Sequence, residues 1–349
     1  MGTSQFVAPV FAKRVDDAVA GLCGVWMVVG LFLDGWAHRN QKPETFFSPW
    51  HGVLYSGFAV SAVWLLRVVR SHQHPGTALI QAIPVGYGLR IVGVAVFGIG
   101  AIGDLIWHEI FGIEVNIEAL LSPTHLVLLT GGLLMASGPI ASTLRRESEN
   151  QRAAWSSTGA IIASVAFILS VLQFFLMYVS PYDYGKYDYD YLIGRDQSRW
   201  LGNQLLVDGI ASVLLFSILV AVAMNFLIRH VRIPKGAFAV IILIPAVLQT
   251  ILTNFDTASR LLGPVAAAAL AELTWPWLRK SLSNVGLVAG WISGLTLVTN
   301  FGVLLGVAID QRITWAVHLW TGLPFLAALL VGVLSVVVQL PGRLTGPAN

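Results

Sequence analysis

Two stretches of this sequence carry aspartate and histidine at matching spacings. Both follow the pattern Gly-x3-Asp-x3-His, a short polar loop, and then Glu-x3-Ser-Pro-x-His-x5-Gly; the first covers residues 30–57 and the second residues 100–131. The loop between the first histidine and the glutamate has five residues in the first copy and nine in the second. Because the ionisable residues keep their spacing while the apolar residues between them change, the repeat indicates a shared chemical task.

The spacing within one copy brings three of these side chains together. Asp34 and His38 are four residues apart, so on a helix they lie on the same face. Ser48 and Pro49 are typical of a helix start, as N-cap and first helical residue, which puts His51 in the first turn of a second helix. Two antiparallel helices joined by a short loop then place the imidazole of His51 opposite the Asp34–His38 pair.

A carboxylate and two imidazoles that converge are a donor set for a metal ion. This set suits copper, iron or zinc better than calcium or magnesium. A glutamate seven residues before the second histidine is expected to support the ligands from outside or to bridge them. The spacing assigns no catalytic residue. The predicted ligands are Asp34, His38 and His51 in the first copy and Asp104, His108 and His125 in the second, with Glu44 and Glu118 as supporting residues.

The composition identifies the setting of this repeat as a membrane. Hydrophobic residues make up 56% of the 349 residues, charged residues 11%, and the mean hydropathy is +0.74, whereas about a quarter of the residues in soluble domains are charged. The single cysteine, Cys23, excludes an intramolecular disulfide and a cysteine-based metal site. A net charge of +3 is too small to indicate nucleic-acid binding, so the basic residues are interpreted as topology signals.

A second interpretation of the repeat needs no metal. Asp and His near helix ends also occur as interfacial polar residues or as structural hydrogen-bond pairs. The metal interpretation is favoured because the spacing recurs, and because ionisable side chains at membrane depth are costly and usually functional.

Apolar stretches of about 20 residues, each enough to cross roughly 30 Å of hydrocarbon, recur along the chain. Pro245, Asn254, Asp256 and Pro264 interrupt the seventh and eighth stretches, which are also consistent with one re-entrant hairpin. The sequence therefore predicts an all-α polytopic membrane protein with nine to ten transmembrane helices. The predicted spans are residues 18–38, 50–70, 82–108, 122–143, 155–178, 203–228, 237–255, 258–276, 284–307 and 313–338.

The first four spans contain both copies of the repeat. Residues 1–145 are therefore predicted to form a duplicated metal-binding region of two two-helix hairpins, and residues 146–349 add six further helices to the same membrane domain. Lysine and arginine concentrate on the cytoplasmic side of membrane proteins. With both termini in the cytoplasm, thirteen of the 21 basic residues fall in inner segments and seven in outer loops. The repeat then faces the outside of the cell membrane.

The run from Asp34 to His51 resembles the signature of the C-type subunit of the copper membrane monooxygenases, the particulate methane and ammonia monooxygenase family. That signature reads Asp-x-x-Trp-His, a five-residue gap, an acidic residue, and then Phe-Thr/Ser-Pro-x-His. The family carries a second ligand set of Asn, His and His about 70 residues further on, where this chain has its second copy, including the pair Trp107-His108. The resemblance covers about residues 25–135 and implies copper at both ligand sets.

The chain also departs from that family. Asp104 stands where the family has asparagine, and the loop of the second copy is longer. The last six helices have no counterpart in the C-type subunit, and nothing resembles the periplasmic cupredoxin-like domains of the family's B-type subunit.

Three functions remain open. The resemblance implies a monooxygenase subunit or relative that oxidises a small apolar substrate with O2, with the lipid bilayer and other membrane or periplasmic subunits as partners. A copper-handling or assembly protein is the second. The chain has only five methionines, and this small number argues against a methionine-rich copper path. A zinc-dependent membrane hydrolase is the third. Metal identity separates these functions.

Overall fold

The computed structural model describes residues 10–42, 45–76, 78–112, 116–146, 154–184, 187, 199–311 and 313–340. Within these ranges every regular element is helical, and nine helices are long and apolar enough to cross a membrane. This confirms the predicted fold class. The helices are α1 (Arg14–Arg39), α2 (Pro49–Ser71), α3 (Gly88–Phe111), α4 (Asn116–Leu121), α5 (Pro123–Arg146), α6 (Trp155–Phe175), α8 (Arg199–His230), α9 (Ala237–Ile251), α10 (Leu262–Leu278), α11 (Val285–Asp310) and α12 (Val317–Gln339), with 3-10 turns η1 (Leu79–Ala82), η2 (Met177–Val179) and η3 (Ala258–Leu261).

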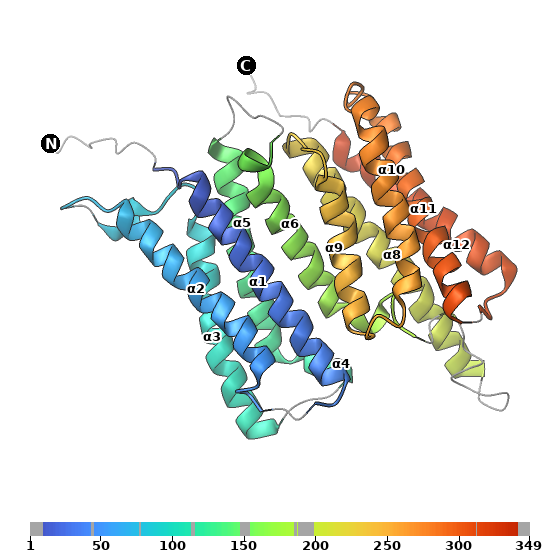
Figure 1. Cartoon of the computed structure of the whole chain (residues 1–349), viewed down its shortest axis with the longest axis horizontal. Helices are drawn as coiled ribbons and strands as arrows, with labels where there is room; N and C mark the ends of the chain where they lie inside the picture. The colour runs from blue at the N-terminus through green and yellow to red at the C-terminus, as the bar shows by residue number, and fades with distance from the viewer. Residues whose placement is uncertain are drawn as a thin grey trace, which may run out of the picture. The chain divides into compact units, whose positions relative to one another are not determined.

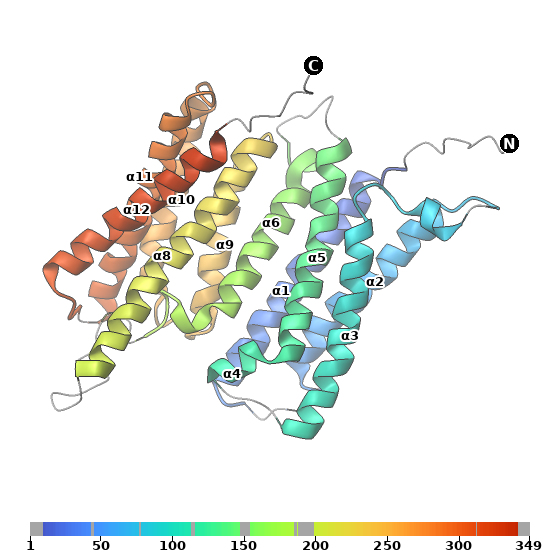
Figure 2. The same cartoon turned by 180° about the vertical axis from the view of Figure 1, so that it is seen from behind.

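The chain divides into two compact units. Unit 1 comprises Met1–Tyr178 and Val231–Pro234, and unit 2 comprises Val179–His230 and Lys235–Asn349. Unit 1 therefore contains α6 in addition to the four long helices of the predicted 1–145 region, because α6 packs against both α1 and α5 (Figure 1). In unit 2, α11 packs between α10 and α12, and α12 also packs against α8 (Figures 1 and 2).

The region predicted to be interrupted forms an antiparallel hairpin of α9 and α10. The chain turns between them where Asn254 and Phe255 adopt positive φ. Pro264 does not break α10, because it lies in the first turn, where a helix needs no backbone N–H. The carboxylate of Glu272 near the end of α10 accepts hydrogen bonds from backbone N–H groups at the start of α9, including that of Gly236 (2.8 Å). At 15 residues, α9 is the short member of this hairpin.

Glycines set the close approach of the helix pairs in unit 1. A Cβ on Gly30 of α1 would lie 2.5 Å from the backbone nitrogen of Leu54 in α2. Gly100 holds the matching place on α3, where a Cβ would lie 3.1 Å from the backbone nitrogen of Leu128 in α5. The α1–α2 and α3–α5 pairs thus meet through glycines at the same positions of the repeat.

The facing helices contribute the other two glycines of the repeat. A Cβ on Gly57 of α2 would lie 3.1 Å from the side chain of Met27, and a Cβ on Gly131 of α5 would lie 2.5 Å from the backbone nitrogen of Phe97. Real Cβ atoms do not approach a backbone atom to 2.5 Å, so a larger residue at position 131 must push α3 and α5 apart.

The other end of unit 1 is tied together by polar contacts. Asp17 of α1 accepts hydrogen bonds from Tyr87, which precedes α3 (2.8 Å), and from Ser142 of α5 (3.1 Å). Arg146 of α5 forms an ion pair with the same carboxylate. In Figures 1 and 2 the start of α1 and the short helix α4 lie at opposite ends of unit 1.

We expect Gly131→Ala to lower the free energy of unfolding by about 1–3 kcal/mol, the usual cost of overpacking a helix contact. The control is Gly98→Ala, also on a helix of this pair, because a Cβ there would meet Phe58 at an ordinary 3.6 Å. Thermal unfolding of the purified protein measures both. Equal melting temperatures for the two variants would contradict a role for Gly131 in the approach of α3 and α5.

Candidate metal centre

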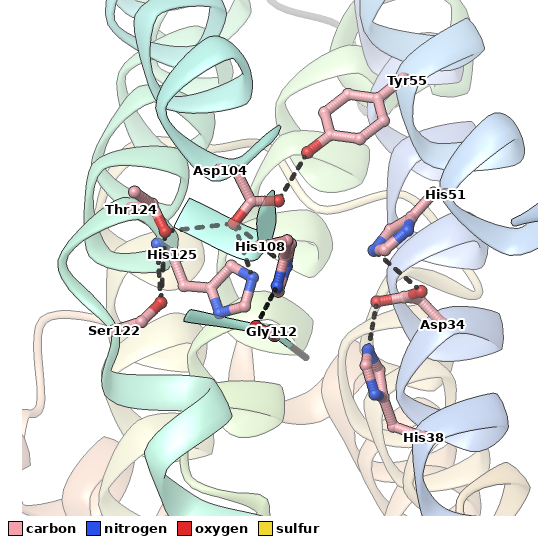
Figure 3. A network of polar contacts seen from close by, with 10 residues as sticks. All are labelled: Asp34, His38, His51, Tyr55, Asp104, His108, Gly112, Ser122, Thr124 and His125. Atoms are coloured by element: carbon pink, nitrogen blue, oxygen red, sulfur yellow. Dashed lines mark hydrogen bonds and ion pairs between the residues drawn. The ribbon is translucent and has the colours of Figure 1, made fainter. Parts of the chain in front are cut away.

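The first Asp/His/His group forms where α1 ends and α2 begins (Figure 3). Nε2 of His51 lies 3.2 Å from Oδ1 of Asp34, and Nε2 of His38 lies 3.6 Å from Oδ2 of the same carboxylate. The two oxygens of Asp34 are therefore divided between the two imidazoles. The candidate ligand atoms of this group all lie within 4.8 Å of one another.

Local sequence explains how the first group is positioned. His38 follows Asp34 by one helical turn in α1. Ser48 is the N-cap of α2, its hydroxyl accepts from the backbone N–H of His51 (3.5 Å), and Pro49 occupies the first turn. The predicted helix start is confirmed, and it fixes His51 on the turn that faces the end of α1.

The second group forms where α3 ends and α5 begins. Nε2 of His125 lies 3.1 Å from Oδ1 of Asp104, and Nε2 of His108 lies 3.6 Å from the same oxygen. The Ser122 hydroxyl accepts from the backbone N–H of His125 (3.3 Å), the equivalent of the Ser48 contact. These candidate ligand atoms also lie within 4.8 Å of one another.

A backbone carbonyl orients one imidazole of the second group. Nδ1 of His108 lies 3.2 Å from the carbonyl oxygen of Gly112. A carbonyl can only accept a hydrogen bond, so this contact requires the proton on Nδ1 and leaves the lone pair of Nε2 for a metal ion. Gly112 ends α3 with φ of 78°, a conformation that favours glycine.

The two carboxylates have different surroundings. The Tyr55 hydroxyl donates to Oδ2 of Asp104 (3.0 Å), and the Thr124 hydroxyl donates to Oδ1 (3.1 Å). Oδ1 of Asp104 faces both imidazoles of its group, whereas Oδ2 is occupied by the phenol of a residue from α2. Among the described contacts of Asp34 there is no such hydroxyl pair, so the groups are similar in ligand type but not equivalent.

The two groups are neighbours. The ring centroids of His51 and His108 are 6.4 Å apart, and Tyr55 of α2 reaches Asp104 of α3 (Figure 3). The residues of the two groups differ in solvent exposure. Asp104 is 1% exposed and His51 is 4% exposed, whereas the side chains of His38 and His125 are 23% and 20% exposed. The centre is thus closed on its inner side and open at one imidazole of each group.

Aromatic side chains adjoin the imidazoles. The ring of Phe46 lies 5.7 Å from that of His51 and 5.5 Å from that of Tyr55. Tyr55 in turn contacts Phe97, whose ring stacks on Phe58 at 4.7 Å. An apolar wall therefore runs from the loop between α1 and α2 along α2 and α3, next to the candidate ligands.

The chemistry of the donors fits a transition metal. Each group offers two imidazole nitrogens and one carboxylate oxygen, the donors that copper, iron and zinc accept. A metal between them would also neutralise a carboxylate buried at membrane depth, which is costly without a cation.

Of the two predicted supporting glutamates, the structure describes only Glu118. Glu44 lies outside the described residues, and Glu118 is exposed on α4, with no described contact to the second group. Tyr55 and Thr124 were not predicted. Tyr55 follows His51 by four residues and Thr124 directly precedes His125, so the helical spacing of Tyr55 was a signal for it.

Comparison of the chain with protein-family models, with curated proteins and with solved structures gives no match in any of the three.

We expect Tyr55→Phe to weaken metal binding at the second group by about 10- to 100-fold, as for other losses of a hydrogen bond to a ligand. The phenol holds one oxygen of Asp104, and its removal lets the carboxylate turn away from His108 and His125. Metal titration of the purified protein measures the affinity of each group. The control is Ser56→Ala on the exposed face of α2, whose hydroxyl bonds only its own helix in the described contacts. Unchanged affinity in Tyr55→Phe would show that Asp104 needs no such support.

Proposed function

We propose that this protein is a membrane copper protein, and a relative of the copper membrane monooxygenases that oxidises a small apolar substrate with O2. The observation that carries the proposal is the pair of adjacent Asp/His/His groups in unit 1. In each group the candidate ligand atoms lie within 4.8 Å of one another.

The donor set is compatible with copper, and the sequence resemblance favours it over other metals. Imidazole and carboxylate donors suit it, and the sequence around Asp34, His38 and His51 resembles the copper-binding signature of the C-type monooxygenase subunit. Copper bound here would supply one-electron chemistry and reactivity with O2. Iron has the same donor preference and zinc binds imidazole equally well, so metal analysis is the direct test.

The residues of this chain would divide the work. Asp34, His38 and His51 would hold one ion, and Asp104, His108 and His125 would hold a second. Gly112 orients His108, while Tyr55 and Thr124 orient Asp104.

The surroundings of the groups fit an apolar substrate. The exposed edges of His38 and His125 leave the centre accessible from one end of the helices. The aromatic wall of Phe46, Tyr55 and Phe97 would exclude water and contact a substrate that partitions into the bilayer. Substrate and partner subunits are expected to meet the protein at this end.

We expect the purified protein to contain copper, with up to two ions per chain, one for each group. Elemental analysis gives the metal content, and EPR of the oxidised protein gives nitrogen hyperfine coupling from the imidazoles. Zinc as the sole metal would contradict the proposal and favour a membrane hydrolase. Copper without substrate oxidation, in the presence of O2 and a reductant, would favour a copper-handling protein.

We expect His51→Ala to abolish the first site and leave the second partly occupied, because the first group then keeps only one imidazole and one carboxylate of its own. The copper content should fall by at least half, and EPR should lose one of two signals. The control is His72→Ala at the opposite end of α2, where the imidazole contacts the carbonyl of Val68. A full copper complement in His51→Ala would exclude His51 as a ligand.

We propose further that both termini are cytoplasmic and that the two groups face the extracytoplasmic side. The support is the excess of lysine and arginine at the opposite end of the helices. Lys42, in the loop after α1, and Gln73, just after α2, lie beyond opposite ends of α2.

In a Cys23→Ser background, we expect a cysteine in Lys42→Cys to react with an impermeant reagent on intact cells. One in Gln73→Cys should react only after the cells are opened. The opposite pattern of labelling would invert the orientation and place the candidate metal centre on the cytoplasmic side.

A further inference from the structure

Unit 1 contains a buried cation far from the candidate metal centre. Arg90 in the first turn of α3 is 2% exposed. Its guanidinium donates to the Ser61 hydroxyl (Nη2, 2.8 Å) and to the carbonyl of Met135 (Nη1, 3.4 Å). Both acceptors are neutral, and Nε of Arg90 is buried with no hydrogen-bond partner among the described residues.

No described carboxylate neutralises this charge by direct contact. The nearest acidic system is that of Asp17, which is already paired with Arg146 and receives hydrogen bonds from Tyr87 and Ser142. Among the described residues, no aspartate or glutamate lies within ion-pair distance of Arg90. The ring of Tyr87 lies 5.9 Å away and offers only a cation–π contact. Burying an unpaired cation costs several kcal/mol, so the site favours an anion.

The space beside Arg90 fits such an anion. Arg90 and Ser61 line a cavity of about 20 Å³, whose other lining residues are mostly small, among them Gly21, Gly24, Gly132 and Ala136. One water molecule needs about 10–15 Å³. The cavity therefore has room for a water molecule or a small ion.

The surrounding helices are shaped to hold the arginine in this place. A Cβ on Gly138 of α5 would lie 2.8 Å from Cβ of Arg90, so only glycine leaves room for the stem of the side chain. A Cβ on Gly24 of α1 would come within 3.3 Å of the Phe167 ring, close to the cavity. Since the Ser61 oxygen accepts from Arg90, its own hydrogen can be donated into the cavity.

We propose that Arg90 and Ser61 bind a small monovalent anion, chloride under physiological conditions, in this cavity. The guanidinium supplies the charge and the free Nε donor, and the Ser61 hydroxyl supplies a second donor. The site is separate from the metal centre, because Arg90 and Asp104 are about 21 Å apart along α3 at 1.5 Å per residue. The anion stabilises the packing of α1, α2, α3 and α5 around the buried charge.

The test compares thermal unfolding of the purified full-length protein in chloride and in gluconate at equal ionic strength. Gluconate is too large for the cavity. We expect the melting temperature to rise with chloride and to saturate, and bromide to replace chloride. Arg90→Gln should abolish the dependence, and Ser61→Ala should raise the chloride concentration needed for half of the effect about tenfold. The control is Arg70→Gln, an exposed arginine at the end of α2, which should keep the full response.

Two further measurements test the anion site if Arg90→Gln does not fold. Arg90→Lys retains the charge without the Nε donor and should keep a weakened chloride response. Crystals grown in bromide should show anomalous scattering beside Arg90 and Ser61. Equal stability of the wild type in chloride and gluconate, a full response in Arg90→Gln, or density without anomalous signal would overturn the proposal and leave a buried water in the cavity.

Discussion

Two carboxylates buried at one end of a membrane-spanning helix bundle are the constraint around which unit 1 is built. Asp34 and Asp104 lie in helices whose outer surfaces suit lipid, where an uncompensated charge is costly. Each carboxylate is met by two imidazoles, one from its own helix and one from the next long helix. That arrangement requires α2 and α5 to approach closely enough for a histidine in the first turn to reach across.

The glycines of the repeat make this approach possible. Gly30 and Gly100 lie one helical turn before the carboxylates. Because they have no side chain, the backbone of their helix can lie directly against the backbone of the facing helix. Without a hydrophobic driving force between helices in lipid, such close contacts and polar bonds hold membrane helices together. The residues that bring the helices together and those that carry the chemistry thus belong to one repeating unit.

The two ends of unit 1 treat buried charge differently. At one end, each carboxylate faces two imidazoles, a donor set suited to a metal cation. At the other, Asp17 is neutralised by Arg146, whereas the described hydrogen bonds of Arg90 reach only neutral oxygens. The inward-facing polar groups therefore favour a cation at one end and an anion at the other, both inside helix contacts made by small residues.

The sequence by itself determined the features that depend on local spacing. The apolar stretches located the spanning helices, Ser48 and Pro49 located the start of α2, and a separation of four residues placed Asp34 beside His38. Only the tertiary structure decided how the helix pairs meet. The proximity of His51 to His108, the bond from Tyr55 to Asp104 and the packing of α6 on α1 and α5 join residues far apart in the chain. Such contacts depend on the distance and the rotation between helices. The fit of glycines against the backbone of the facing helix sets both, and the residue spacing within one helix does not contain this information.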